Sequence, residues 1–220
     1  MSLFQNRSAP VTFRFGFVEA PFSVLCDAFQ NWFQTVDTKH AVRTAFHAMT
    51  AQLEEAVLSL EPLTTPPDRY LLVETTSNWT AIFANGLRGN DVASAVGYLP
   101  RILNCRGLEV GYAPERSKSQ CKDLIHRWGH TLFALYGPQD TDWLNRIRYV
   151  SVWNDASGWE FDESGELQPF EEAQAYRNKR IRDRFTSEML ERYCRALGIE
   201  LSNANFYGLR SANDWPKATR

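Results

Sequence analysis

Three short β-prone runs decide the fold class: HTLFALY (His130–Tyr136), IRYVSVW (Ile147–Trp153) and WEF (Trp159–Phe161). They are rich in β-branched and aromatic residues, and Gly, Asn or Asp follows each of them, as is typical of strands. Because they succeed one another without an intervening helical pattern, they favour antiparallel pairing over the βαβ alternation of a parallel sheet.

Further strands are predicted on both sides of these runs. Alternating phenylalanines in segment 11–18 show the period of a half-buried strand. Segments 70–74 and 79–83 flank a polar stretch and predict a hairpin, and segment 108–112 predicts one more strand. Segment 159–168 reads as a second hairpin around a glycine turn.

Three segments in the first half of the chain show helical periodicity. Apolar residues recur at intervals of three and four along Phe22–Val36 and again along Val42–Leu60. A third helix is predicted from an N-cap at Asp91 to about Asn104, and Pro100 weakens that pattern.

The longest helix is predicted over Glu171–Leu197, where apolar residues recur every four positions and Gly198 occupies the C-cap position. The last twenty residues are polar, and we expect them to be frayed, with docking contacts from Phe206, Tyr207 and Trp215.

Together these elements predict an α+β fold with a mainly antiparallel sheet, helices packed on one face and a long C-terminal helix. Its 220 residues are about one and a half typical domains, and no Pro-, Gly- or Ser-rich linker divides them. We therefore expect residues 1–220 to form a single α+β domain.

Composition narrows the classes of function. Lys and Arg number 24 against 26 Asp and Glu, a net charge of −2 that argues against a dedicated nucleic-acid binder. The N-terminus has no apolar h-region and no apolar run reaches the length of a membrane span, so we expect a cytoplasmic protein without a membrane partner. The four cysteines are scattered, which is typical of buried or idle thiols.

Motifs of catalysis and cofactor binding are absent: the sequence contains no GxGxxG, GxxxxGK[ST], HExxH or GxSxG. Cys121, His126 and His130 are spaced five and four residues apart, which would place both histidines on one face of a helix. Gly129 and the strand pattern after it interrupt such a helix. The sequence therefore predicts no catalytic residue, no metal site and no cofactor, and it leans against an enzyme.

The tryptophans provide the remaining signal, because Trp79 and Trp159 flank predicted turns. Aromatic side chains in such places are either lids on the core or anchors of a binding surface, where Trp and Arg are enriched. We expect a turn-rich edge to cover the active site of a partner protein. Its predicted partner-binding residues are Trp79, Asn85, Arg88, Asn90, Asp91 and Trp159.

Segment Asn78–Asp91, together with Gly158–Phe161 and Pro169–Glu171, resembles uncharacterised bacterial cytoplasmic proteins of the toxin-immunity type. The resemblance covers about half of the chain and includes no catalytic motif. It implies an immunity protein that neutralises a bacterial toxin by stoichiometric binding, and it assigns no role to any single residue.

Two alternatives remain open. The chain could be a small-molecule enzyme or ligand-binding protein with a site at the sheet edge, and the candidates for that site are Glu74, Arg88, Asp91, His126, His130 and Asp155. A basic cluster within the predicted long helix could contact RNA or DNA; it comprises Arg177, Lys179, Arg180, Arg182 and Arg184.

Overall fold

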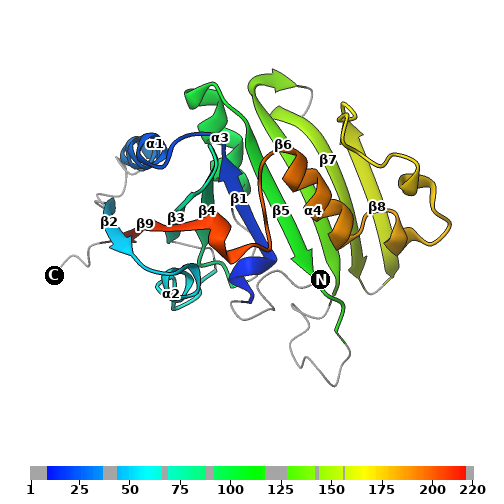
Figure 1. The fold of residues 1–220 in the computed structure, drawn as a ribbon, viewed down its shortest axis with the longest axis horizontal. Coiled ribbons are helices and arrows are strands. Elements are labelled where there is room, and N and C mark those ends of the chain that lie inside the picture. Colours follow the sequence, from blue (N-terminus) through cyan, green and yellow to red (C-terminus); the bar gives the residue numbers. More distant parts are fainter. Residues whose placement is uncertain are drawn as a thin grey trace.

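The computed structural model describes residues 9–36, 44–65, 69–87, 92–116, 128–141, 144–155 and 157–216. Within these ranges nine strands form one sheet in the order β2-β9-β3-β4-β1-β5-β6-β7-β8, with every neighbouring pair antiparallel (Figure 1). The strands are β1 (Arg14–Val18), β2 (Thr44–Thr50), β3 (Tyr70–Thr75), β4 (Thr80–Ala84), β5 (Gly107–Ala113), β6 (His130–Thr141), β7 (Leu144–Asp155), β8 (Gly158–Gly165) and β9 (Tyr207–Pro216). The predicted α+β class with a mainly antiparallel sheet is confirmed.

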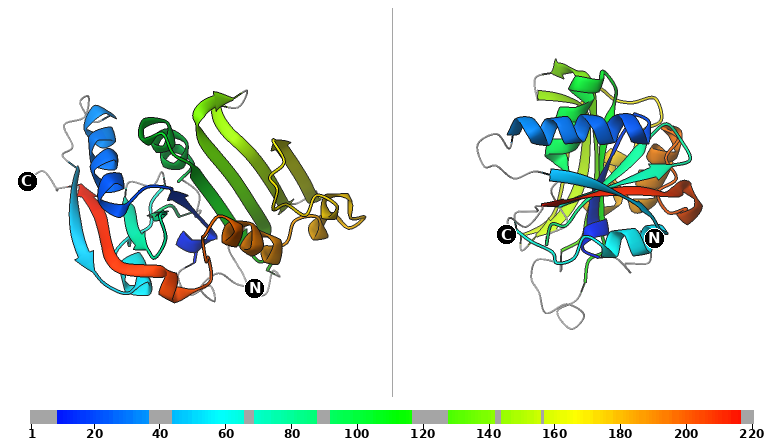
Figure 2. Two further views of the ribbon diagram at one scale, coloured as in Figure 1. Left: turned by 45° about the horizontal axis from the view of Figure 1, so that its top comes forward. Right: turned by 90° about the vertical axis from the view of Figure 1, so that its left-hand side faces the viewer.

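Helices cover both faces of this sheet, so the prediction of helices on one face is wrong (Figure 2). The helices are α1 (Phe22–Val36), α2 (Leu53–Leu58), α3 (Ala93–Leu103) and α4 (Ser187–Ala196). α1 and α3 pack on one face, and α2 and α4 pack on the other. The reason lies in the central strands: Leu71, Leu72 and Val73 are consecutive and all buried, and such continuous apolar strands need cover on both sides.

The strongest local patterns of the first half are confirmed. α1 spans the predicted Phe22–Val36, and the β3–β4 hairpin forms as expected. α3 approaches the sheet closely over two glycines, since a Cβ at Gly107 would overlap the Val96 carbonyl and a Cβ at Gly16 would overlap the Val96 side chain. Because glycine has no side chain, Gly16 and Gly107 allow α3 to lie directly on β1 and β5.

The predicted helix over Val42–Leu60 is wrong. Residues 44–50 form edge strand β2, which pairs with β9 along its whole length, and the helix α2 spans only Leu53–Leu58. The apolar spacing suits a helix, but a partner strand more than 150 residues away overrides that local preference.

The predicted long helix over Glu171–Leu197 is also wrong. Only Ser187–Ala196 form the α-helix α4, whose N-cap Thr186 accepts a hydrogen bond from the Met189 amide. Short 3-10 turns at Ala175–Arg177 and Ile181–Asp183 precede it. In place of the first turns of that helix, Glu171 and Tyr176 form a buried network with Arg148 that holds this part of the segment against the sheet.

Two further predictions fail at the C-terminal end. Residues 158–165 form one strand, β8, which pairs with β7. The hairpin predicted within 159–168 is therefore absent from these described residues. Residues 207–216 form β9, which lies between β2 and β3 rather than fraying. Phe206 and Tyr207 are buried in the core, as their predicted docking required. None of the helices in the described part of the chain is both long and apolar enough to cross a membrane.

Candidate functional site

One surface of β5–β7 carries polar side chains in place of a continuous apolar layer. Side chains alternate along a strand, so Val150 and Val152 of β7 face the core beside α4, whereas Tyr149 and Ser151 face the opposite side. We call this opposite surface, together with the end of β1 beside it, the open face. Its residues are Arg14, Glu109, His130, Leu132, Tyr149, Ser151 and Trp153.

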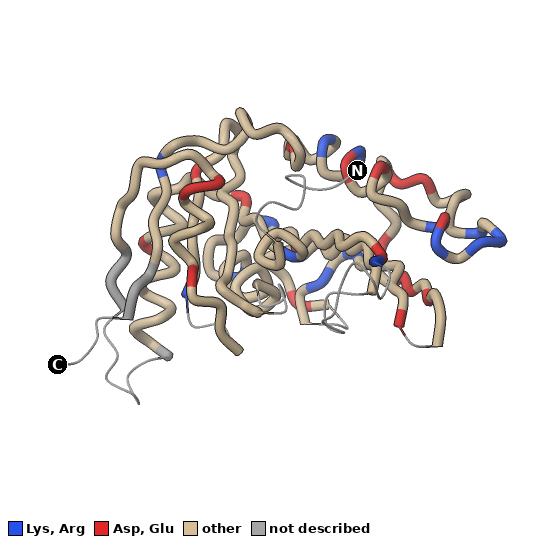
Figure 3. Tube along the Cα trace, turned by 90° about the horizontal axis from the view of Figure 1, so that it is seen from below, with Lys and Arg blue, Asp and Glu red and all other residues tan. Residues whose placement is uncertain are grey.

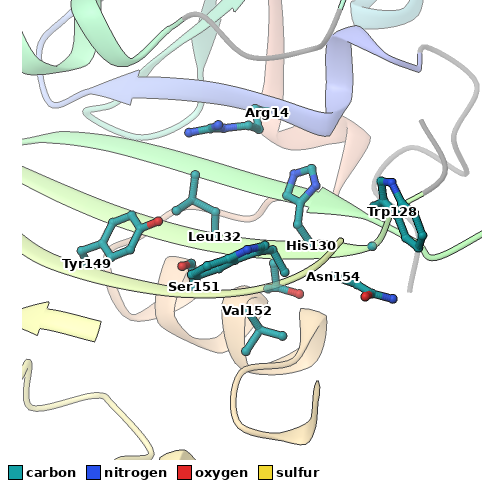
Figure 4. A pocket seen from close by; sticks show the side chains of 11 residues that line it. Arg14, Trp128, His130, Leu132, Tyr149, Ser151, Val152 and Asn154 are labelled. Carbon is teal, nitrogen blue, oxygen red and sulfur yellow. The ribbon is translucent and has the colours of Figure 1, made fainter. Parts of the chain in front are cut away.

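A cavity of about 340 Å³ lies on the open face. Figure 4 shows Trp128 and Tyr149 at its two ends, with His130 and Leu132 between them and Arg14 reaching over the strands from β1. Both aromatic side chains are partly exposed. The cavity thus combines aromatic walls with a small number of polar groups, as ligand and anchor sites do.

The charge of Arg14 is balanced from within the sheet. Arg14 Nη2 lies 2.5 Å from Glu109 Oε1, and the Glu109 side chain is only 4% exposed. The Tyr136 hydroxyl donates to the second carboxylate oxygen at 3.5 Å. Burial, and then the charge of Glu109, raise the pKa of Tyr136, so that hydroxyl keeps its proton and can continue to donate. The pair contributes no net charge to the cavity.

His130 is held neutral. Burial, followed by the nearby charge of Arg14, lowers its pKa to about 4, against the opposing effect of the Phe13 carbonyl. Nε2 lies 3.3 Å from that carbonyl oxygen, so a neutral ring carries its proton on Nε2 and leaves Nδ1 as an acceptor. Gly111 makes this packing possible, because a Cβ there would lie 2.9 Å from Arg14 Cγ and 3.1 Å from His130 Nε2.

Two buried polar atoms of the open face have no hydrogen-bond partner in the described part of the chain: Arg14 Nε and Ser151 Oγ. Ser151 is 4% exposed and lines the cavity. A buried polar group left unpaired costs about 1–3 kcal/mol, so proteins seldom keep one without a reason. The open face therefore retains hydrogen-bonding groups that a bound molecule could pair.

The opposite face of the same sheet holds a second ion pair, which is complete. Arg148, 2% exposed, binds both oxygens of the fully buried Glu171 through Nε at 2.8 Å and Nη2 at 2.9 Å. Its Nη1 reaches Glu163 at 2.5 Å and the Gly165 carbonyl at 3.2 Å. The Tyr176 hydroxyl also donates to Glu171 at 2.5 Å. This network ties residues 165–176 to the sheet, and we assign it a structural role.

The described residues offer little for nucleophilic or metal chemistry. Burial raises the pKa of the Cys26 and Cys105 thiols to about 11 and that of Cys194 well above its ordinary value. A thiol needs the opposite shift to act as a nucleophile near neutral pH. Within the described ranges no three His, Cys, Asp or Glu side chains gather as a metal would require. Cys121 and His126 lie outside those ranges.

The described members of the predicted partner-binding set, Trp79, Asn85 and Trp159, do not share one surface. Trp79 is 3% exposed and its indole N–H donates to the Leu197 carbonyl, while Asn85 is fully buried and binds the Arg69 amide and the Pro62 carbonyl. Neither presents surface to a partner in this fold, and their role in binding stays a prediction. Trp159 is half-buried against the core on the α4 side. Arg88, Asn90 and Asp91 lie outside the described residues.

The described members of the alternative site, Glu74, His130 and Asp155, do not lie together either. Glu74 pairs with Arg210 across β3 and β9 at 3.3 Å, and Asp155 accepts hydrogen bonds from Ser157 at the β7–β8 turn. Of the set's described members only His130 lines the cavity. Sequence analysis missed Arg14, Glu109 and Ser151. Arg14 and Glu109 could have been noticed in the sequence, because each is a charged residue within a short, otherwise apolar segment that predicts a strand.

Comparison with models of protein families, with curated proteins and with solved structures gave no match. The function therefore has to be argued from the open face and its cavity.

Proposed function

We propose that this chain is a binding protein that covers a partner protein with its open face and performs no chemistry of its own. The supporting observation is the cavity, in which aromatic walls surround buried polar atoms that have no hydrogen-bond partner among the described residues. An inserted partner group that hydrogen-bonds to Ser151 or Arg14 would remove part of the penalty that these atoms now carry.

The residue types of the open face suit this proposal. Trp, Tyr and Arg supply most of the binding energy in protein interfaces, and the cavity presents Trp128, Trp153, Tyr149 and Arg14 together. Tyr149 is further held by the Arg146 guanidinium, 4.5 Å from its ring centroid. A side chain positioned before binding loses less entropy when the partner arrives.

The narrower proposal follows the resemblance to toxin-immunity proteins. In it the chain is a cytoplasmic immunity protein, and the partner is a toxin domain whose active site is blocked in a one-to-one complex. Such a complex would bury about 1,600 Å² in total. A blocker of this kind needs rigid anchors on a preformed surface rather than a reactive group, which is consistent with the neutral His130 and the protonated thiols.

The test is co-expression with the product of the neighbouring reading frame, followed by affinity measurement on the purified complex. Tyr149→Ala should weaken the complex by about 30-fold, the effect of removing one central anchor. Tyr98→Ala is the matched control, because Tyr98 is a 40% exposed tyrosine on α3, outside the open face. It should change the affinity by less than about threefold. Absence of a stoichiometric complex, or equal losses in the two variants, would contradict the proposal.

A small-molecule ligand is the second candidate, and the size of the cavity favours it. At about 340 Å³ it reaches the lower end of the range for ligand pockets, roughly 300–1,000 Å³. Native mass spectrometry of the protein purified from its own cells tests this alternative. A retained small molecule that is lost in Ser151→Val would support it, and an unliganded mass throughout would count against it.

A further inference from the structure

A second surface of the molecule is strongly charged. Residues 177–184 read RNKRIRDR, with five basic side chains against one acidic side chain. We call its basic side chains the basic tip, and they are Arg177, Lys179, Arg180, Arg182 and Arg184. The segment carries a net charge of +4 in a chain of net charge −2, so the remainder of the chain carries −6.

Four of these side chains are exposed at one end of the molecule: Arg177, Lys179, Arg180 and Arg182. The segment leaves β8 and runs beyond it through the 3-10 turn Ile181–Asp183 (Figure 1). Figure 3 shows Lys and Arg grouped at this end, with Asp and Glu on neighbouring parts of the chain. The side chains of Arg180 and Arg182 are 66% and 47% exposed. In a regular helix the same residues would have been spread around the helix axis.

The base of the tip is firmly held. The Arg184 guanidinium lies over the Phe161 ring at 5.6 Å, and its Nε donates to the Asn178 carbonyl at 2.9 Å. The Asn178 side chain in turn donates to the Asp183 carbonyl at 3.0 Å. A partner would therefore meet a preformed group of cations, with less backbone entropy to lose on binding.

These cations are poorly neutralised. In the described ranges Asp183 is the one carboxylate within 4.0 Å of the tip, at 3.9 Å from Arg180 and 3.7 Å from Arg182. Exposed contacts of this length contribute little. Elsewhere Arg192 has its own carboxylate, Glu172, at 2.6 Å. The tip thus keeps most of its charge for an external partner.

The neighbouring strand indicates the class of partner. β8 carries Glu160 and Asp162, both exposed, next to the tip. A nucleic acid extending from the tip along the molecule would meet these carboxylates, and its phosphates would be repelled. A protein surface with an acidic patch next to a neutral or basic area would complement both the basic tip and the acidic side chains of β8.

We propose that the basic tip binds an acidic patch, a cluster of Asp and Glu side chains, on the partner protein. This rests on the proposed function to the extent that the partner is a protein, but it does not require the partner to occupy the open face. Charge contacts at the rim of an interface mainly speed association and select the partner.

The test uses the full chain with two fluorescent probes, a peptide rich in Asp and Glu and a DNA duplex, measured by anisotropy. Arg180→Ala/Arg182→Ala is compared with Arg101→Ala/Arg195→Ala, which removes the same charge from exposed positions off the tip. At about 20 mM salt the tip variant should bind the acidic peptide about tenfold more weakly, and the control within about twofold of wild type. Binding of the wild-type chain should fall steeply toward about 150 mM salt.

Three outcomes would overturn the proposal: no binding of the acidic peptide at low salt, equal losses in the two variants, or tip-dependent binding of the duplex that is tighter than that of the peptide. The last outcome would assign the tip to nucleic acid. A failure of the proposed function would appear separately, in the comparison of Tyr149→Ala with Tyr98→Ala. All four substituted arginines are exposed, so unfolding curves should match wild type and exclude misfolding.

Discussion

Each face of the sheet holds an arginine–carboxylate pair, and the two pairs differ in burial and in how many of their polar atoms are hydrogen-bonded. On the α4 side Arg148 and Glu171 are almost inaccessible, and Arg148 uses all three of its guanidinium nitrogens. On the open face Arg14 is 31% exposed, and its Nε has no partner in the described residues.

This difference separates a structural role from a binding role. A fully connected buried network fixes local conformation, and a partly connected one carries a penalty that only another group can remove. The Arg148 network holds an irregular segment, 165–176, against the sheet. The Arg14 pair joins two regular strands, holds no irregular segment among the described residues, and borders a cavity.

The largest expected effect comes from removing the carboxylate charge on each face. Glu171→Gln should lower the free energy of unfolding by about 3 kcal/mol, because Arg148 is left buried with only the exposed Glu163 as counter-ion. Glu109→Gln should lower it by about 1 kcal/mol, because the part-exposed Arg14 can be hydrated. Urea unfolding of both variants measures the two values. Equal losses would remove the distinction between the faces.

The next effect is a pH dependence confined to the open face. The folded-state pKa of His130 is about 4, below the ordinary value of 6.5, so the unfolded chain binds an extra proton between these values. Its contribution is therefore fully present above about pH 6.5 and is lost as the pH falls toward 4, by up to about 1.4 kcal/mol per pH unit.

His130→Gln isolates this contribution, since the amide can still donate to the Phe13 carbonyl but does not titrate. The difference in unfolding free energy between wild type and variant should change across pH 6.5 to 4 and stay constant above it. A constant difference over the whole range would contradict the neutral state assigned to His130.

The last comparison takes one hydroxyl from each face, Tyr193 on the α4 side and Ser151 on the open face. The Tyr193 hydroxyl bonds Tyr176 at 2.9 Å and accepts from the Glu172 amide at 2.8 Å, so Tyr193→Phe should cost about 1–3 kcal/mol. Ser151→Ala breaks no hydrogen bond within the described residues and removes a buried unpaired hydroxyl, so it should stabilise the protein by about 1 kcal/mol. Thermal unfolding of the two variants measures both changes in stability. A large loss of stability in Ser151→Ala would mean that the Ser151 hydroxyl already has a hydrogen-bond partner.

Elements whose structure depends on residues close by in the sequence were predicted better than elements that depend on distant residues. Helix α1 and the β3–β4 hairpin depend on spacing within a few residues and were predicted correctly. β2 and β9 lie far apart in sequence and stabilise one another, so neither shows a clear local strand pattern. Segment 171–186 forms 3-10 turns, and its Glu171 pairs with Arg148 of β7, a long-range contact that local periodicity does not encode.

The candidate site was harder to predict for the same reason. Arg14, Glu109, His130 and Ser151 belong to four different strands and converge only because β1, β5, β6 and β7 are neighbours in the sheet. Strand order is not visible in a single sequence. Of these four residues, only His130 was among the candidates.

The most direct test of the binding role is hydroxyl-radical footprinting of the chain alone and in complex with the product of the neighbouring reading frame. If the open face receives the partner, Tyr149 and Trp128 should lose most of their labelling in the complex, while Tyr98 on α3 should keep its own. A stable complex that leaves Tyr149 and Trp128 as reactive as in the free chain would contradict the account.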